Sequence, residues 1–473
     1  MRTECNPEQL EFHDFGRREV SARFDGGMIS SDGGGLLLRE VEKRTGILSR
    51  LANQFTDHRD PRRCEHTVEE LIAQRVMALA LGYEDLNDHD LLCADSLLAV
   101  LVGKADPQGQ SRRRNPGKPL ASSSTLNRLE LTPKDATAAD RYKKVVANSE
   151  GIDRLLVDIF LESYSAPPER IWLDLDATDD PVHGHQEGRF FHGYYRHYCY
   201  LPLYIFCDDQ LLCARLRQAD QDGAAGSIEE LTRIVDQIRQ RWPTTEIVIR
   251  GDSGFCRDSI MNWCEARDHV HYVLGLAKNA RLNRALGEAM HEAKQQHQQQ
   301  GQAVRVFDEF DYQTRKSWAR SRRVIGKAEH LDKGANPRFV VTSLPQTEVD
   351  AQTLYERLYC ARGDMENRIK EQQLCLFADR TSTATMRANQ LRLYFSSFAY
   401  VLLNALRRMG LRGTDLERAQ CDTVRLRLLK IGTRVRISVR RIRLSFSEGY
   451  PFADLFREVL DNLRAIPLYP DTS

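Results

Sequence analysis

The sequence has almost no net charge, because 68 Lys and Arg residues stand against 67 Asp and Glu residues in a chain of 473. Such a chain has no global attraction for nucleic acid or an acidic membrane, so a polyanionic partner must be held by local basic patches. It also lacks a run of roughly 18 apolar residues, the length of a membrane span, and its first residues, MRTECNPEQLEF, contain no apolar signal segment. We therefore expect a cytoplasmic protein with no membrane partner.

Paired cysteines are missing as well. The 11 cysteines are scattered singly from Cys5 to Cys421 without a C-x-x-C pair, which argues against a disulfide scaffold and a zinc ribbon. Residues 183–199, HGHQEGRFFHGYYRHYC, collect several histidines and Cys199, but their spacings fit no standard zinc module. We expect reduced core thiols, and a polar loop that runs into a strand over 183–199.

Residues 1–165 have the pattern of short amphipathic helices. Thr67 and Glu70 have the spacing of a capping box, which predicts a helix start, and a second helix is expected over 88–102. The glycines of DGGGLLLRE lack the Lys-Ser/Thr ending of a nucleotide loop, which favours a plain turn. A basic loop, SRRRNPGKP, then precedes the short helix SSSTLNRLE. We interpret 1–165 as a helical DNA-binding region that uses Arg112, Arg113 and Arg128, and a solvated helical subdomain is the alternative.

The character of the chain changes at about residue 166. Strands are expected over 171–177, 198–206 and 210–217, then a helix over 227–240 with a capping box at Ser227 and Glu230. A strand (246–255), a helix (257–267), a strand (271–277) and a helix (281–296) follow. This order is typical of a ribonuclease-H-like α/β layer, and we assign the first part of such a core to residues 166–296.

The second half of the chain completes the expected domain plan. The polar stretch QQHQQQGQ leads into alternating segments that predict a small antiparallel β insertion over 297–348. Helical patterns return over 349–410, which we assign to the second part of the ribonuclease-H-like core, with the helix that carries Glu366 and the helix after it. Residues 411–473 are a basic region of strands and a final helix. The fold class is therefore α/β: a ribonuclease-H-like catalytic core interrupted by a β-strand insertion, with a mostly helical N-terminal region and a mixed basic C-terminal region.

Carboxylates follow two of the expected core strands. In WLDLDATDD, Asp174 and Asp176 share one face of a strand, and Asp252 ends another strand in RGDSG. Sites gather at strand ends in open α/β sheets, so these acids can converge and bind Mg²⁺, an ion that prefers oxygen ligands. The alternative for each acid alone is a solvated aspartate.

A third acid comes from the helix YCARGDMENRIKEQQ. At about 100° per residue, Tyr359, Arg362, Glu366 and Lys370 fall on one face. Glu366 completes a metal site, and the two cations suit the phosphates of a polyanion, although a helix glutamate beside arginine is often only a surface ion pair. Two divalent ions held by three carboxylates carry the phosphodiester chemistry of nucleases, polymerases and transposases.

Three motifs resemble the DDE transposases of bacterial insertion sequences: LDLDATDDPVHGHQEG, IVIRGDSGF and Y-x-x-R-G-x-x-E-N-x-I-K-E. The resemblance covers nearly the whole chain and is closest to group one of the transposase DDE domains, in the branch with a Tyr-Arg-Glu-Lys signature. It implies the triad Asp176, Asp252 and Glu366, with two Mg²⁺ (or Mn²⁺) ions per active site. It also implies a homodimer on DNA that binds terminal inverted repeats, cleaves at the element ends and joins the 3′-hydroxyl to target DNA.

The sequence departs from the family pattern at the signature lysine. Gln373 stands at that position, seven residues after Glu366, so we assign the phosphate-binding role to Lys370. Asp174 is the alternative first acid, and the spacing to Thr178 favours Asp176.

Two further DNA contacts are expected. The resemblance implies that Trp318, near Arg322, stacks on a base flipped from the transposon end, an interaction worth about 1–3 kcal/mol; a core tryptophan is the alternative. In VRLRLLKIGTRVRISVRRIRL the arginines alternate with apolar residues, which predicts a strand with one cationic face that uses Arg436 and Arg440 for phosphates. A nuclease without strand transfer and an inactive DNA-binding protein remain the alternative functions.

Overall fold

The computed structural model describes residues 9–470, and the chain splits into two compact units. Unit 1 comprises 1–49, 59–128 and 405–473, and unit 2 comprises 50–58 and 129–404. The expected helical region 1–165 therefore contributes to both units, and the basic C-terminal region shares a unit with it. None of the helices within 9–470 is both long and apolar enough to cross a membrane.

Unit 1 is built on helices and a small sheet. Thr67 and Glu70 form the predicted capping box of α3, with the Glu70 N–H donating to Thr67 Oγ1 at 3.1 Å. The helix expected over 88–102 is broken, because Asp95 accepts hydrogen bonds from the N–H groups of Leu97 and Leu98 and starts α5 there. The main elements are β1 (Leu10–Phe15), β2 (Arg18–Ala22), β3 (Met28–Ser30), α1 (Gly35–Thr45), α3 (Val68–Leu81), α4 (His89–Leu92), α5 (Ser96–Val102), α15 (Cys421–Val424), β18 (Thr433–Ser438), β19 (Arg441–Phe446) and α16 (Ala453–Arg464).

The glycines of DGGG have a packing role in unit 1. Gly34 donates its N–H to the Leu429 carbonyl at 3.1 Å. A Cβ on Gly34 would lie 1.7 Å from the Leu428 carbonyl oxygen, so only glycine allows this approach. The predicted turn is confirmed, and it brings the start of α1 against the segment before β18.

Unit 2 contains, within the part of the chain that is described, a nine-stranded mixed sheet. Strands β6, β12 and β13 are parallel, and the pairs on either side of them are antiparallel. In sheet order the strands are β11 (Gln210–Arg215), β10 (Leu203–Cys207), β6 (Arg170–Ala177), β12 (Glu246–Gly251), β13 (Val270–Leu276), β17 (Arg338–Thr342), β15 (Arg322–Leu331) and β14 (Val304–Tyr312), with β16 (Gly334–Ala335) beside β15. This mixed α/β fold is consistent with the expected ribonuclease-H-like core.

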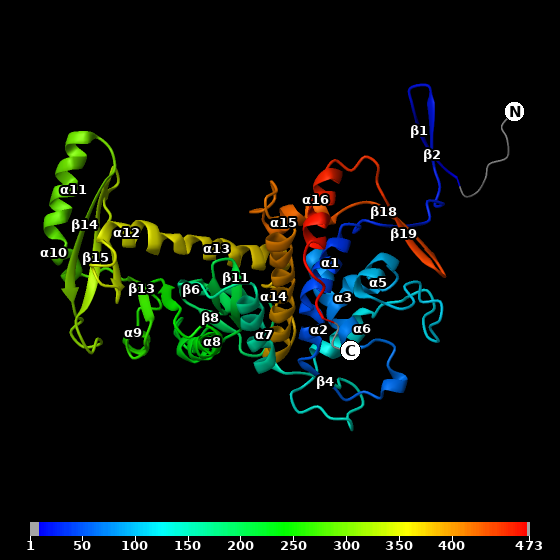
Figure 1. Cartoon of the computed structure of the whole chain (residues 1–473), viewed down its shortest axis with the longest axis horizontal. Coiled ribbons are helices and arrows are strands. Elements are labelled where there is room, and N and C mark those ends of the chain that lie inside the picture. The colour runs from blue at the N-terminus through cyan, green and yellow to red at the C-terminus, as the bar shows by residue number, and fades with distance from the viewer. Residues whose placement is uncertain (1–8, 471–473) are drawn as a thin grey trace. The chain divides into compact units, whose positions relative to one another are not determined.

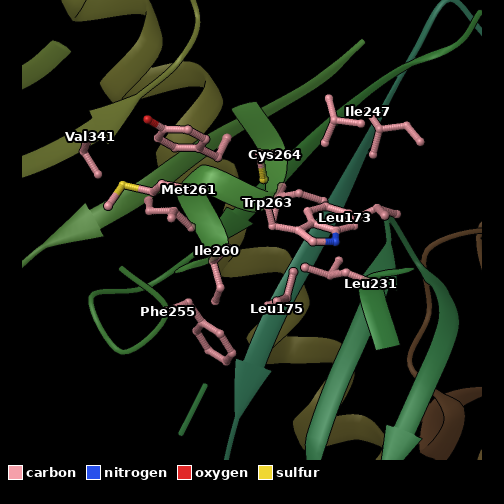
Figure 2. Close-up of a cluster of buried hydrophobic side chains, with 14 of the residues drawn as sticks. Leu173, Leu175, Leu231, Ile247, Phe255, Ile260, Met261, Trp263, Cys264 and Val341 are labelled. Carbon is pink, nitrogen blue, oxygen red and sulfur yellow. The ribbon is translucent and has the colours of Figure 1, made fainter. Parts of the chain in front are cut away.

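The two faces of the sheet are covered by different helices (Figure 1). Leu173 and Leu175 of β6 face a core that includes Leu231 and Met261, as Figure 2 shows. That core is supplied by α7 (Ser149–Glu162), α8 (Ser227–Arg241), α9 (Asp258–Glu265), α10 (Ala280–Ala285) and α11 (Gly287–Gln300). On the opposite face, Leu354 packs against Val248 and Val273. Even-numbered residues of β6 therefore face the helical segment 351–375.

The helical segment 351–375 is irregular. It consists of α12 (Ala351–Thr353), a π-helical stretch (Leu354–Tyr359), a 3₁₀ turn (Cys360–Arg362), α13 (Gly363–Lys370) and a second π-helical stretch (Glu371–Cys375). π-helical turns often mark functional sites. The segment precedes α14 (Met386–Met409).

The strands expected as a β insertion extend the central sheet. β14, β15 and β17 are antiparallel to one another, as predicted, and β17 pairs with β13 of the core. The small sheet expected over 297–348 is thus continuous with the core sheet, because β17 supplies the hydrogen bonds that β13 would otherwise leave open.

One local prediction was wrong. Ser227 does not cap α8: the N-cap residue is Gly226, Ser227 is the first helical residue, and Glu230 forms ion pairs with Arg215 and Arg233. Residues 183–199 run into a strand as predicted, and they add one more short strand to a three-stranded sheet. Its strands are β7 (Asp180–Pro181), β9 (His197–Tyr200) and β8 (Phe190–His192).

Candidate active site

Asp176 and Asp252 lie at the ends of neighbouring parallel strands. Asp174 pairs with Arg250 and Leu175 with Gly251 in the register of β6 and β12, so Asp252 follows β12 at the level of Asp176. The turn after β12 is fixed by the Gly254 N–H, which donates to Asp252 Oδ1 at 2.8 Å. A Cβ on Gly254 would lie 2.9 Å from that same oxygen, so glycine keeps the turn tight. The predicted convergence of the two strand ends is confirmed.

Arg362 joins this pair of strands to the helical segment. Its Nη2 atom lies 3.2 Å from Asp176 Oδ1, and its Nη1 atom lies 2.9 Å from Glu366 Oε1. Its Nε atom is buried and has no hydrogen-bond partner among the described residues. One guanidinium therefore bridges the first and third predicted acids.

The electrostatics show that the acids share one environment. The pKa of Asp176 is raised to about 6, chiefly by burial; the carboxylates of Asp252 and Glu366 contribute to this rise, and Arg362 opposes it. Burial alone would lower the pKa of Arg362, but Asp176, Asp252 and Glu366 outweigh burial and raise it. The site thus concentrates negative charge around a single cation.

Asp174, the alternative first acid, has a structural partner. It is buried, and Arg250 of the next strand contacts both of its carboxylate oxygens, with Nη2 2.6 Å from Oδ2. Arg250 also donates to the Leu358 carbonyl, which ties β12 to the helical segment. Because its charge is matched by a bidentate ion pair, Asp174 supports the site, and Asp176 is the acid that faces Arg362.

Tyr359 reaches the site through a gap left by a glycine. A Cβ on Gly275 of β13 would lie 2.5 Å from Tyr359 Oη and 3.0 Å from the Ser253 nitrogen. Burial raises the pKa of Tyr359, and Asp252 adds to this rise while Arg362 opposes it. Tyr359, Arg362 and Glu366 therefore gather beside the strand ends, as the helical spacing predicted.

Lys370 and Gln373, the two candidates for the position of the signature lysine, have different surroundings. Lys370 is exposed. Gln373, at the position of the signature lysine, donates from Nε2 to the Asp179 carbonyl at 3.1 Å. Gln373 thus binds the backbone just after β6.

The donor set suits a hard divalent cation. Within residues 9–470, no three His, Cys, Asp or Glu side chains are placed to hold a metal ion as they stand. Asp176 and Glu366 are instead held by the guanidinium of Arg362, a stand-in cation. Oxygen-only donors and excess negative charge suit the coordination chemistry of Mg²⁺ or Mn²⁺.

Trp318 is not placed for base stacking. It is 7% exposed, and its ring packs in the core against Tyr312 and Arg322. Arg322 is also buried, with ion pairs to Asp258 and Glu265 at 2.7 Å. Trp318 is therefore a core tryptophan, which was the alternative to base stacking, and the Arg322 guanidinium binds carboxylates of α9.

The other predicted DNA contacts lie in unit 1. Arg113 and Arg128 are exposed, whereas Arg112 forms an ion pair with Glu65. On β18, Thr433 and Val435 are buried while Arg434 and Arg436 are exposed, which confirms the predicted strand with one cationic face. Arg440 is exposed between β18 and β19, and Arg436 lies directly opposite Arg443 across the hairpin. Like charges placed opposite each other are destabilising unless a counter-charge is present.

Sequence reasoning missed two supporting residues. Arg250 neutralises Asp174, and Gly275 makes room for Tyr359. The signal for Arg250 was its place two residues before Asp252, which puts both side chains on the same strand face.

Acids from two strand ends and one helix, held around a guanidinium at the edge of an α/β sheet, form an acidic candidate active site. The family model described as Transposase DDE domain group 1 matches residues 12–468, and the chain therefore belongs to this family. The expected resemblance to group one of the transposase DDE domains is confirmed. A search among curated proteins found no match. Among solved structures, the chain is similar to a piggyBac transposase in a synaptic complex with hairpin DNA. The identity is 11% and the TM-score 0.40, over 94% of this chain and 86% of that chain.

Proposed function

We propose that this chain is the transposase of an insertion sequence: it binds the terminal inverted repeats, cleaves DNA at the element ends and joins the 3′-hydroxyl to target DNA. The observation that carries the proposal is the bridge from Asp176 through Arg362 to Glu366, beside Asp252. Membership of the transposase DDE family supports the reaction class.

Asp176, Asp252 and Glu366 are the proposed ligands of two Mg²⁺ or Mn²⁺ ions. When bound, such ions polarise the phosphodiester and lower the pKa of the attacking water or 3′-hydroxyl. Neighbouring residues hold these ligands in place. The Gly254 N–H orients the Asp252 carboxylate, and the Asp174–Arg250 pair fixes β6 against β12.

Arg362 has two proposed roles. In the DNA-free protein it neutralises both acids, and its pairing with Asp176 holds the helical segment on the end of β6. When DNA binds, its guanidinium is suited to a phosphate oxygen beside the scissile bond. Tyr359 and the exposed Lys370 are proposed to contact the same strand, and two element ends require two active sites, hence a homodimer on DNA.

The test is a joining assay with end-labelled element DNA and a supercoiled plasmid target. To define the element ends, the DNA that flanks the coding region would be searched for short inverted repeats. Wild-type protein with Mg²⁺ should nick the ends and give labelled plasmid, while Asp252→Asn should retain end binding and lose both products.

Two outcomes would redirect the proposal. Nicking without joined product would identify the chain as a nuclease. End binding without metal-dependent nicking would identify it as an inactive DNA-binding protein. Asp311→Asn, which changes an exposed aspartate of β14, is the matched control and should behave as wild type.

A further inference from the structure

The hairpin formed by β8 and β9 pairs with β7, just after β6, and exposes aromatic side chains. Phe191 is 49% exposed and Tyr198 is 44% exposed, and the two residues pair directly across the hairpin. Their rings contact edge to face at 5.5 Å. Tyr194, in the turn, is 81% exposed. Large rings left in water in this way are typical of a surface that binds a partner.

The two faces of this hairpin have different surroundings. Strand alternation places Phe191 and Tyr198 on one face, and His197 and Cys199 on the other. Cys199 is buried, and His197 Nε2 lies 2.8 Å from Asp179 Oδ2. One face therefore anchors the hairpin to the segment that follows β6, which leaves the aromatic face to solvent.

The anchored face connects the hairpin to the proposed active site. Asp179, three residues after Asp176, also accepts a hydrogen bond from Gln373, which follows the helix that carries Glu366. The pKa of Tyr195, in the hairpin turn, is raised to about 12, chiefly by burial, and the charges of Asp179 and Asp176 contribute to this rise. The hairpin is thus attached to the segment that directly follows Asp176.

Cations on the hairpin suit a polyanion. The Arg189 guanidinium lies 4.6 Å from the centroid of the Tyr198 ring, and Arg196 is exposed in the turn. An arginine stacked on an exposed aromatic pair provides both a π-face for a base and a charge for its phosphate.

We infer that the hairpin 189–198 is a stacking surface for unpaired nucleobases of the DNA strand that passes the acids. Phe191 and Tyr198 carry the bases, and Arg189 and Arg196 bind the flanking phosphates. This inference rests on the proposed function, because that function brings a DNA strand to the acids. Recognition by stacking is independent of base sequence.

The test measures binding of the full-length protein in EDTA, by fluorescence anisotropy, to two labelled probes. One probe is single-stranded oligothymidylate of about 20 nucleotides, longer than the ~4–16 that such a surface covers. The other is a blunt duplex of similar length. Phe191→Ala and Tyr198→Ala should each weaken binding to oligothymidylate by roughly 5- to 150-fold, the loss of one stacked base. Duplex binding should stay close to wild type, because the bases of a duplex are already stacked.

Two controls match the substitution. Tyr198→Phe keeps the ring and should retain single-strand binding. Tyr142→Ala removes another exposed ring, 51% accessible and also paired with an arginine at 5.1 Å, from the segment before β5 (Val145–Ala147). It should bind both probes as wild type does. Circular dichroism and thermal melting would verify that each variant is folded.

The inference is overturned if both alanine variants bind oligothymidylate as wild type does, or if they weaken both probes equally. It is also overturned if they alter only self-association in sedimentation, since the face would then bind a second copy of the chain. In each of these cases metal-dependent joining by wild type would leave the proposed function intact. Failure of wild type to bind either probe would instead contradict the proposed function.

Discussion

Asp176→Asn should stabilise the metal-free protein near pH 8. The pKa of Asp176 is raised from 3.8 to about 6 in the folded chain, chiefly by burial, and this value already includes the favourable effect of Arg362. The side chain is only 16% exposed, so solvent screening removes little of the effect. At about 1.36 kcal/mol per pH unit of difference, ionised Asp176 destabilises the folded state by about 3 kcal/mol.

The sign of the pH dependence follows from the raised pKa. The folded state holds the Asp176 proton more tightly than the unfolded state, so the penalty is fully present above pH about 6. It decreases as the pH falls and disappears below about 4, where both states are protonated. The neutral amide of asparagine avoids the penalty, so the variant should exceed wild type by about 1–3 kcal/mol at pH 8 and equal it near pH 4.

Native-state hydrogen exchange of the β6 and β12 amides in EDTA measures this free energy locally. A local measurement is needed because a chain of two units does not have to unfold in one step. Asp311→Asn controls for the loss of a surface charge. A variant that is less stable than wild type at pH 8, or a difference that does not change with pH, would refute the assignment of Asp176 to a crowded acidic site.

Three further changes test the surroundings of the acids and the cationic face of β18. Arg362→Ala should strengthen Mn²⁺ binding, measured by electron paramagnetic resonance, by about tenfold or more, because it removes a charged hydrogen-bond partner of two ligands; weaker binding would show that Arg362 supports the site without competing for it. Gly275→Ala should abolish most end cleavage, because the new methyl group collides with the Tyr359 hydroxyl. Adding Tyr359→Phe removes that hydroxyl and should restore part of the lost activity. No restoration would show that the methyl group collides with a different group. Arg436→Ala should reduce the slope of log affinity for end DNA against log salt by about 1; an unchanged slope would exclude a phosphate contact.

The acids on the strands could be predicted from the sequence because strand geometry is periodic. Asp174 and Asp176 are two residues apart and share a face, and strand ends of parallel neighbours meet at one edge. Tyr359, Arg362 and Glu366 followed from helical spacing in the same way, although the segment mixes α, 3₁₀ and π turns. Over these few residues the irregular turns do not move the three side chains off the site.

Features set by long-range packing could not be predicted. Trp318 has basic neighbours in the sequence, but its burial depends on Tyr312 and on the α9 carboxylates that hold Arg322. The Ser227 capping spacing failed because Glu230 pairs with Arg215 of β11, a partner that spacing along the helix does not reveal. The bridge made by Arg362 required three segments to be placed together.

The central claim is that Asp176, Asp252 and Glu366 hold divalent metal in one site. Anomalous X-ray scattering from crystals of the full-length protein grown with Mn²⁺ tests it most directly. The account predicts Mn²⁺ density bound by oxygen atoms of all three carboxylates, with Arg362 moved away from Asp176. Mn²⁺ bound elsewhere, or Arg362 still bridging Asp176 and Glu366 at saturating Mn²⁺, would contradict it.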